Sequence, residues 1–357
     1  VYKKTVSDLN KGINTILKFM TFLVVPLCVL LIWSQVRTVG GWNAAISTGE
    51  WRSAVISAVA GVVGMIPEGL VLLTSLNFAL AAIRLARKNT LVQELESVET
   101  LARVDCLNLD KTGTVTDGTI RLDSVELLDI RSSGTMCGNV NEHDVKQALF
   151  DLSNEGQPNG TGQAILSGLW EQGFADGTVE ARVPFSSARK WSSIYDGNAV
   201  WTMGAPEVIL SQIDGDHADI LKQVNDFAND GNRVLLVARI DGAAPDDYET
   251  NPKLNPASCP VALVCCSEHI RADAEETLAW FREQGVRCRV ISGDNPVTVG
   301  AIARKVHLTG EHEPRFMDAR ELPADITELA QVLENVDVLG RVLPDQKKAI
   351  VEALHAG

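Results

Sequence analysis

The sequence lacks closely spaced cysteine pairs. Its seven cysteines are scattered, none forms a C-x-x-C pair, and their number is odd. Thiolate metal centres and dense disulfide frameworks both need paired spacings, so neither is indicated. The adjacent Cys265 and Cys266 lie in the apolar run 261–266 and are expected to be buried strand residues. The pattern predicts reduced thiols in a cytosolic environment.

Basic residues are also scarce: 32 Lys and Arg face 46 Asp and Glu, which gives a net charge of −14. Nucleic acid requires a basic protein face, so nucleic-acid binding is not expected. The charge is unevenly distributed, because residues 1–90 hold nine basic and three acidic side chains, net +6, which leaves −20 for the remainder. A chain of 357 residues has room for two or three domains. We expect its two parts to lie in different solvents.

Two long apolar runs lie near the start of the chain, at about 16–36 and 54–84. About 20 apolar residues cross a bilayer core, so each run predicts a transmembrane helix. Basic residues flank the outer ends of the pair, whereas the connection holds only Arg37 and Arg52. The positive-inside rule therefore places the start and everything after residue 84 in the cytoplasm. Two buried core helices, the alternative, would not explain the lengths and charged flanks.

One carboxylate, Glu68, stands inside the second run between Pro67 and Gly69. Proline removes a backbone donor and interrupts a helix, so freed carbonyls and the carboxylate together offer hard oxygen ligands. Such ligands suit Ca²⁺ or Mg²⁺ rather than soft metals, and an intramembrane acid is costly to keep. We expect Glu68 to bind a hard cation. The alternative is a proline kink beside a protonated glutamate.

A short apolar run at 104–109 ends in Asp-Lys-Thr-Gly-Thr at 110–114. This pattern predicts a buried parallel strand with Asp110 at its carboxyl end, where ligands bind in open α/β sheets. A carboxylate there can accept a phosphoryl group. Lys111 can neutralise phosphoryl charge, and the Thr112 hydroxyl can hydrogen-bond to it. An ordinary polar turn is the alternative.

The pentapeptide resembles the phosphorylation motif of P-type ATPases, which are pumps of the haloacid-dehalogenase-like superfamily that form an aspartyl phosphate. The resemblance implies that Asp110 attacks the γ-phosphate of ATP, with Mg²⁺ held by Asp110 and Thr112. Related phosphatases carry an acid/base Asp two residues after the nucleophile, where this chain has Thr112. Hydrolysis of the acyl phosphate then lacks local help, which suits an intermediate that must persist.

The stretch around Glu68 carries the resemblance further. Pro-Glu-Gly-Leu at 67–70 is similar to the motif in the fourth transmembrane helix of calcium-type P-type ATPases, in which the Glu is an ion ligand. Heavy-metal members have cysteine near this proline, and none is present here. Ca²⁺ is therefore the favoured cargo.

Residues 123–262 have a different character, with strands interrupted by Gly, Asn and Ser, and predict an insertion between two segments of one sheet. The stretch 182–191 offers an aromatic face and cations, although an exposed basic hairpin would have the same composition. By resemblance, the insertion is the nucleotide-binding domain, and its expected contacts with ATP are Phe185, Arg189, Lys190, Gly204 and Arg233. Met203 replaces the usual lysine and Gly162 a glutamate that often contacts adenine, so some contacts must differ.

The sheet is expected to resume at 263–357, with strands at 286–291 and 335–339 and a helix that starts at Pro296. Three stretches there are similar to family motifs. The stretch 268–271, Glu-His-Ile-Arg, loosely resembles D-P-P-R and adds Arg271 to the cofactor-binding residues. The stretch 292–294 resembles T-G-D, with Ser in place of Thr, and the stretch 341–347 resembles R-V-x-P-x-x-K. By this resemblance the catalytic residues also include Ser292, Gly293, Asp294, Arg341 and Lys347. Lys347 is expected to hold the transferred phosphate.

These features predict an α/β, Rossmann-like phosphorylation domain in two parts, 89–122 and 263–357, with an inserted α+β nucleotide-binding domain and a membrane segment at 1–88. The chain ends before the family's G-D-G-x-N-D motif and lacks its actuator domain, so we expect a part of a longer, multi-pass inner-membrane pump that uses ATP and Mg²⁺. The alternatives are a membrane-anchored phosphatase of the same superfamily and a non-catalytic ATP-sensing regulator.

Overall fold

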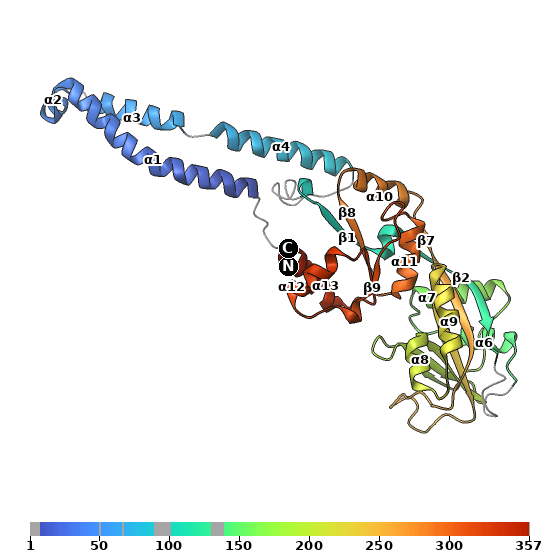
Figure 1. The fold of residues 1–357 in the computed structure, drawn as a ribbon. Coiled ribbons are helices and arrows are strands. Elements are labelled where there is room, and N and C mark those ends of the chain that lie inside the picture. The colour runs from blue at the N-terminus through green and yellow to red at the C-terminus, as the bar shows by residue number, and fades with distance from the viewer. Residues whose placement is uncertain (1–7, 50, 66–67, 89–100, 130–138, 357) are drawn as a thin grey trace. The chain divides into compact units, whose positions relative to one another are not determined.

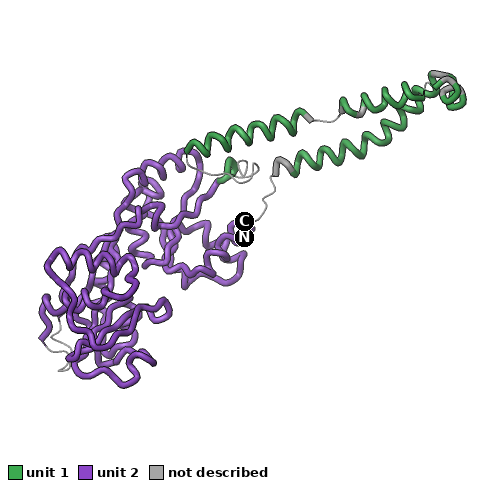
Figure 2. The backbone as a smooth tube through the Cα atoms, turned by 180° about the vertical axis from the view of Figure 1, so that it is seen from behind, with its two compact units in different colours: residues 1–104 green, residues 105–357 purple. Residues whose placement is uncertain are grey.

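The computed structural model describes residues 8–49, 51–65, 68–88, 101–129 and 139–356. The chain divides into two compact units, Val1–Val104 and Asp105–Gly357, which Figure 2 shows in different colours. The first unit is helical in its described part, and the second holds two sheets with helices on their faces (Figure 1).

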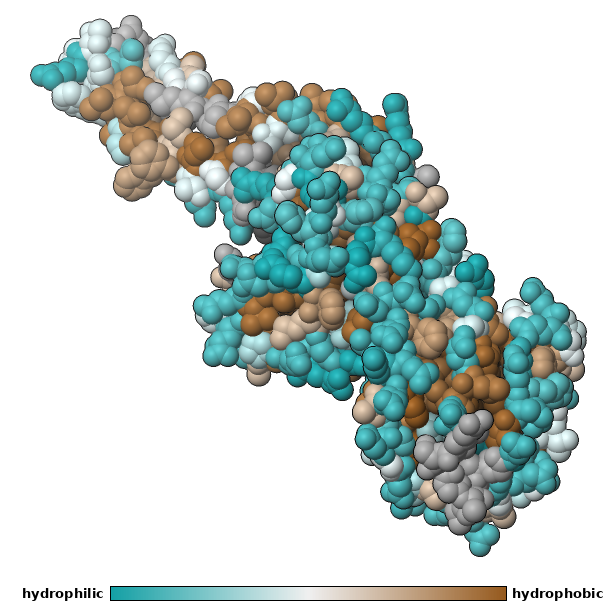
Figure 3. Space-filling view, turned by 45° about the vertical axis from the view of Figure 1, so that its right-hand side comes forward, coloured by the Kyte–Doolittle hydropathy of each residue, from teal (hydrophilic) through white to brown (hydrophobic). Residues whose placement is uncertain are grey.

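Unit 1 contains four described helices: α1 (Asp8–Val39), α2 (Trp42–Thr48), α3 (Trp51–Met65) and α4 (Glu68–Arg87). Two of them are long and apolar enough to cross a membrane, over Lys11–Thr38 and Gly69–Arg87. Their large apolar side chains are mostly exposed, as at Phe22 (76%) and Leu72 (72%), and Figure 3 shows hydrophobic side chains along the surface of this unit. Apolar surface of this extent is stable when lipid or further protein covers it.

The second apolar run differs from the single helix expected at 54–84. It forms α3 and α4, and residues 66–67 between them lie outside the described chain. A proline at 67 cannot continue the hydrogen-bond ladder of a preceding helix, which agrees with this division. The connection between the two runs also holds the short helix α2, bounded by Gly41 and Gly49 at φ +108° and +72°, conformations that glycine adopts without strain.

The first sheet of unit 2 is parallel throughout, in the order β1-β8-β10-β9. Its strands are β1 (Cys106–Asp110), β8 (Arg287–Ile291), β9 (Phe316–Asp318) and β10 (Val338–Gly340). Neighbouring residues in a strand point to opposite faces, and Val290 packs with helices α10 (Ala274–Glu283) and α11 (Pro296–Lys305), whereas Ile291 packs with α12 (Ile326–Glu334) and α13 (Pro344–Ala356). The sheet is therefore covered by helices on both faces, as a parallel sheet requires.

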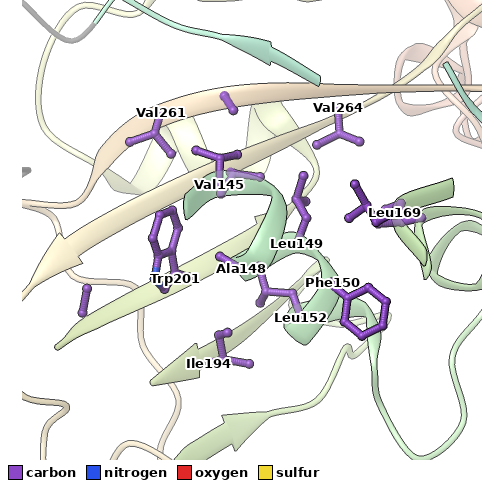
Figure 4. Close-up of a cluster of buried hydrophobic side chains, with 14 of the residues drawn as sticks. Val145, Ala148, Leu149, Phe150, Leu152, Leu169, Ile194, Trp201, Val261 and Val264 are labelled. Carbon is purple, nitrogen blue, oxygen red and sulfur yellow. The ribbon is translucent and has the colours of Figure 1, made fainter. Parts of the chain in front are cut away.

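The second sheet is antiparallel, in the order β2-β7-β6-β5-β4-β3. Its strands are β2 (Thr116–Leu127), β3 (Ala181–Val183), β4 (Trp191–Tyr195), β5 (Ala199–Gly204), β6 (Arg233–Asp241) and β7 (Cys259–Ile270). Helices α6 (Glu142–Ser153) and α7 (Gly160–Glu171) cover one face, where Leu149 and Leu152 pack near Ile194 and Trp201 (Figure 4). Helices α8 (Pro206–Gln212) and α9 (Ala218–Asn229) pack on the other. The mixed α/β class is as predicted.

Strands β2 and β7 are longer than the sequence pattern indicated. They pair from Thr116 and Ile270 to Leu127 and Ala262, so the expected limits of the insertion, 123 and 262, fall within continuous strands. The division into a phosphorylation and a nucleotide-binding domain stays a prediction, with these two strands common to both.

The cysteines depart from expectation at one position. Cys265 and Cys266 are buried and free in β7, as predicted, and Cys28, Cys106 and Cys288 are free as well. Cys259, at the start of the same strand, is disulfide-bonded, so the prediction of uniformly reduced thiols is wrong there. Local spacing does not show such a bond, because folding can join cysteines that are far apart in the sequence.

Candidate functional site

The carboxyl ends of three parallel strands meet at one edge of the first sheet. Asp110 is in register with Ile291 of β8, which is in register with Leu339 of β10. Asp110, Ser292 and Arg341 therefore stand at the ends of adjacent strands, as the sequence predicted. We call this group the strand-end edge.

Lys347, on α13, reaches this edge. Its Nζ donates a hydrogen bond of 3.0 Å to Oδ1 of Asp110, 237 residues away in the sequence. The two side chains are 47% and 63% exposed, so an incoming ligand has access to both. The pair places a cation beside a carboxylate that a phosphoryl donor can approach.

The turn after Asp110 buries Lys111, whose side chain is only 2% exposed. Lys111–Val115 forms one irregular helical turn, in which Gly113 has a φ of +82°. The Lys111 ammonium donates to Oε1 of Glu268 at 2.6 Å and also to Asp294. Thr116 donates to the other Glu268 oxygen at 2.7 Å, and the Thr112 hydroxyl lies 3.4 Å from it. A buried ammonium needs such partners, because an unpaired one would lose its hydration without compensation.

Arg233, at the start of β6, completes this charged network. Its guanidinium donates to Glu268 at 2.9 Å and to Asp294 Oδ2 at 2.8 Å, and its other arm donates to Thr161 at 2.8 Å. Burial raises the pKa of Asp294, but the opposing charges of Arg233 and Lys111 outweigh it and hold that pKa below its ordinary value. The network is two cations and two carboxylates, so Asp294 is ionised at neutral pH.

The loop of Ser292 and Gly293 precedes α11. Ser292 is buried and accepts a 3.2 Å hydrogen bond from the backbone N–H of Asp294, whereas Gly293 is exposed. Asn295 caps the helix by accepting from Val297 at 2.9 Å, and Pro296 occupies the first turn, as expected. The N-terminus of a helix therefore lies directly after this loop, which favours an anion.

Arg341 lies at the strand-end edge by its backbone, while its side chain is engaged elsewhere. Its φ is +52°, and its N–H donates to the Asp294 carbonyl at 2.8 Å. Its guanidinium bonds Glu207 at 3.3 Å and Asp318 at 2.6 Å. Burial raises the pKa of Asp318, but hydrogen bonds from Arg320 and Arg341 lower it to about 2. None of the contacts found in the described chain joins the Arg341 side chain to Asp110.

A cavity of about 210 Å³ lies beside the antiparallel sheet. Three predicted cofactor residues line it, Phe185, Gly204 and Arg233, and so do the two departures from the family pattern, Met203 and Gly162. Its lining residues are Leu152, Ser153, Glu155, Pro158, Asn159, Thr161, Gly162, Phe185, Ser192, Met203, Gly204, Arg233 and Leu235. Arg233 therefore belongs both to the cavity and to the charged network near Asp110.

The structure shows what two of the lining residues contribute to the cavity. Phe185 is 43% exposed, so part of its side chain is accessible to a ligand. Gly204 allows β4 and β5 to approach, because a Cβ there would lie 2.3 Å from the Lys190 carbonyl oxygen.

The other three predicted cofactor residues do not line the cavity. Arg189 stacks 5.5 Å from the Trp191 ring and donates to the Pro184 carbonyl at 2.6 Å. Lys190 is exposed at a φ of +68°. Arg271 follows β7 and bonds Asp273 at 3.2 Å.

The sequence interpretation left Glu268, Thr116, Thr161 and Glu155 out of the site. Glu268 did carry a signal, since it opens the stretch that loosely resembles D-P-P-R and stands where that motif has its Asp. The two threonines are short polar residues in polar surroundings and gave none.

The expected cation ligand of unit 1 is only partly described. Glu68 begins α4, but its side chain lies outside the described residues, as does Pro67. Within the described chain, no group of three or more His, Cys, Asp or Glu is placed to hold a metal.

Several known proteins are similar to this chain over nearly its whole length. No family model matches the chain. The calcium-transporting ATPase CtpE of Mycobacterium tuberculosis is 41% identical over 355 residues, which cover 98% of this chain and 40% of that protein. The probable cation-transporting ATPase exp7 of Streptococcus pneumoniae is 31% identical over 98% of this chain and 42% of its own. The magnesium-transporting ATPase, P-type 1, of Salmonella typhimurium is 26% identical over 99% of this chain and 39% of its own.

These similarities identify the chain as part of a P-type ATPase. Within that family it is similar to members named for the transport of calcium and other cations. The chain spans about two fifths of the length of these relatives.

Proposed function

We propose that the protein containing this chain is an ATP-driven cation pump of the inner membrane that works through a phosphorylated Asp110. The observation that carries the proposal is the pairing of Asp110 with Lys347 at the strand-end edge, at 3.0 Å. It brings together two separate motifs of the family resemblance at the place where a parallel sheet binds phosphates.

The proposed reaction is a direct phosphoryl transfer. An Asp110 carboxylate oxygen forms a bond to the γ-phosphorus of ATP, the bond from that phosphorus to the β,γ-bridging oxygen breaks, and ADP leaves with the electron pair. Lys347, beside Asp110, stabilises the charge on the transferred group. Lys111 and Asp294 hold the loop after β1 and the loop before α11 in fixed positions relative to each other.

Mg²⁺ fits this site by the chemistry of its donors. It prefers oxygen ligands and is usually held by one or two carboxylates together with substrate phosphates and water. Asp110 is 63% exposed and can contribute one such carboxylate, with Thr112 as the second proposed ligand. The metal would supply charge neutralisation for the transferred phosphoryl group.

The cavity is the proposed site for the base of ATP. Phe185 would stack on the base, and Leu152, Met203 and Leu235 supply an apolar lining. Arg233 would face the phosphates, since it lines the cavity and also bonds Asp294. We assign this cavity to a nucleotide-binding domain of about 123–262, inserted into a haloacid-dehalogenase-type phosphorylation domain.

The membrane part of the proposal concerns the cargo. Three observations support Ca²⁺ or another hard divalent cation as the transported ion. They are the two candidate membrane spans, the lone acid Glu68 in the second apolar run, and the relatives named for calcium transport. The catalytic unit would then lie in the cytoplasm and the helices in a bilayer, with the remaining helices of a multi-pass pump supplied by other parts of the protein.

The experiment that tests the mechanism is phosphorylation of the full-length protein with γ-labelled ATP. Wild type should form an acid-stable, hydroxylamine-sensitive phosphoenzyme, and Asp110→Asn should abolish it because the amide is a poor nucleophile. Asp105→Asn, at an exposed carboxylate just before β1, is the matched control and should still label. Label that persists in Asp110→Asn would place the nucleophile elsewhere.

The cargo proposal is tested with Glu68→Gln, which keeps size but removes the charge. Cation affinity should fall while ATP affinity is unchanged, so phosphoenzyme formation should require much more cation. Titrations with Ca²⁺, Mg²⁺ and Mn²⁺ in turn measure this, and an unchanged cation dependence would reject Glu68 as a ligand.

A further inference from the structure

Two polar side chains at one side of the cavity have unused hydrogen-bonding capacity. Ser153, the last residue of α6, is 3% exposed, and its Oγ is buried with no hydrogen-bond partner in the described chain. Glu155 lies two residues further on, and its Oε1 accepts a 3.0 Å hydrogen bond from the backbone N–H of Phe185. Both residues line the cavity. A buried hydroxyl without a partner is uncommon, and a ligand that supplies one explains it.

The rest of the cavity offers few alternatives for reading a base. Gly162 has no side chain, and a Cβ there would already lie 3.3 Å from Pro158. Met203 provides only a weak thioether acceptor. Asn159 uses its side-chain oxygen to cap α7 by accepting from Gly162. Thr161 already accepts from Arg233. Among the lining residues, Glu155 carries the carboxylate and Ser153 the buried hydroxyl without a partner, so we assign recognition of a heterocycle to these two.

We propose that Glu155 and Ser153 read the Watson–Crick edge of adenine, an inference that rests on the proposed binding of ATP. An ionised carboxylate only accepts hydrogen bonds, so Glu155 takes one from the 6-amino group. The Ser153 hydroxyl donates to N1, which is the adjacent acceptor. The pair is thus complementary to the donor–acceptor order of adenine. Hypoxanthine has an oxygen at position 6, which the Glu155 carboxylate opposes, whereas the Ser153 hydroxyl can also accept from the proton on its N1.

The same contact also gives Glu155 a positioning role. Because its other oxygen holds the Phe185 backbone, one side chain sets both the stacking ring and the edge-reading group. Selectivity of this kind is large, since the wrong base would leave a carboxylate facing an oxygen without a proton between them.

The test compares ATP and ITP binding to the full-length protein in EDTA, where no phosphoryl transfer occurs. Wild type should prefer ATP. In Glu155→Gln, the amide oxygen can still accept from Phe185, while the amide N–H₂ faces the base and favours the 6-oxo group. The ATP-to-ITP preference should fall about ten- to hundredfold. Glu171→Gln, at the exposed end of α7 and away from the cavity, is the control and should keep the wild-type ratio.

An unchanged ratio in Glu155→Gln, or an equal loss of affinity for both nucleotides, would overturn the assignment of Glu155. If wild type bound neither nucleotide, the proposed function itself would fail and the inference with it, so the two failures are distinguishable.

Ser153→Ala tests the other half. It should weaken ATP about three- to tenfold and leave the affinity for 1-deaza-ATP, which lacks the N1 acceptor, unchanged. A change limited to packing would weaken both nucleotides alike, and that result would remove Ser153 from the proposal.

Discussion

The two sheets of unit 2 carry opposite kinds of chemistry. Parallel strands all end at the same edge, so their loops converge, and there the protein collects Asp110 and Lys347. The charged network joins this edge to the antiparallel sheet, because Lys111 bonds Glu268 of β7 and Asp294 bonds Arg233 of β6. Strands of the antiparallel sheet alternate in direction, and the cavity beside it is mainly apolar, with Leu152 and Leu235 in its lining. The difference matches the two ends of ATP, since a triphosphate requires charge and a base requires a flat apolar slot.

The largest effect is expected at the strand-end edge. Lys347→Met removes the cation 3.0 Å from Asp110, so the rate of phosphoenzyme formation should fall about 10²- to 10³-fold, while ATP affinity should change little. Rapid-quench labelling at saturating ATP measures the rate. The neighbouring Lys348→Met, at an 82% exposed side chain, is the control. Equal rates in the two variants would contradict a role for Lys347 in the chemistry.

The cavity should respond in the opposite way. Phe185→Ala removes a stacking surface worth about 1–3 kcal/mol, so ATP should bind about five- to 150-fold more weakly, with a normal rate of phosphorylation once ATP saturates. Calorimetry gives the affinity, and Trp170→Ala, at a 66% exposed ring on α7, serves as the control. If the Phe185 variant lost rate but no affinity, the assignment of chemistry to one sheet and binding to the other would be wrong.

Arg233 contacts both regions. We expect its substitution to have the smallest of the three effects, with part of that effect in each region. Arg233→Gln leaves Lys111 alone to compensate Glu268 and Asp294, which should cost on the order of 2 kcal/mol of stability. Thermal unfolding of the full-length protein measures this loss, and Arg233→Lys should restore part of it. An unchanged midpoint in the Gln variant would show that the network does not stabilise the fold.

The sequence was most informative where local pattern and topology coincide. An apolar run followed by a polar turn predicted the ends of β1 and β8, and parallel strands must align those ends, so Asp110 and Ser292 were placed at one edge in advance. The start of α11 at Pro296 followed from proline's missing N–H.

Local patterns could not predict contacts between segments that are far apart in the sequence. Lys111 was expected to face a phosphate, yet it is buried against Glu268 and Asp294, 157 and 183 residues away. Arg341 was expected among the catalytic residues, and its guanidinium bonds Glu207 and Asp318. A basic side chain shows its charge in the sequence but not which carboxylate folding brings to it. The ends of β2 and β7 were missed because long strands can pass from one domain into another without a turn.

These two strands also have a mechanical consequence. Each has 12 residues, so the pair forms a stiff ribbon about 40 Å long that connects the cavity region to the strand-end edge. Its ladder is interrupted twice, between Thr116 and Ile120, next to Glu268, and between Leu122 and Ser124. A strand bends and twists most strongly at such an interruption. Glu268, the carboxylate that holds Lys111, therefore lies where the two strands leave regular pairing.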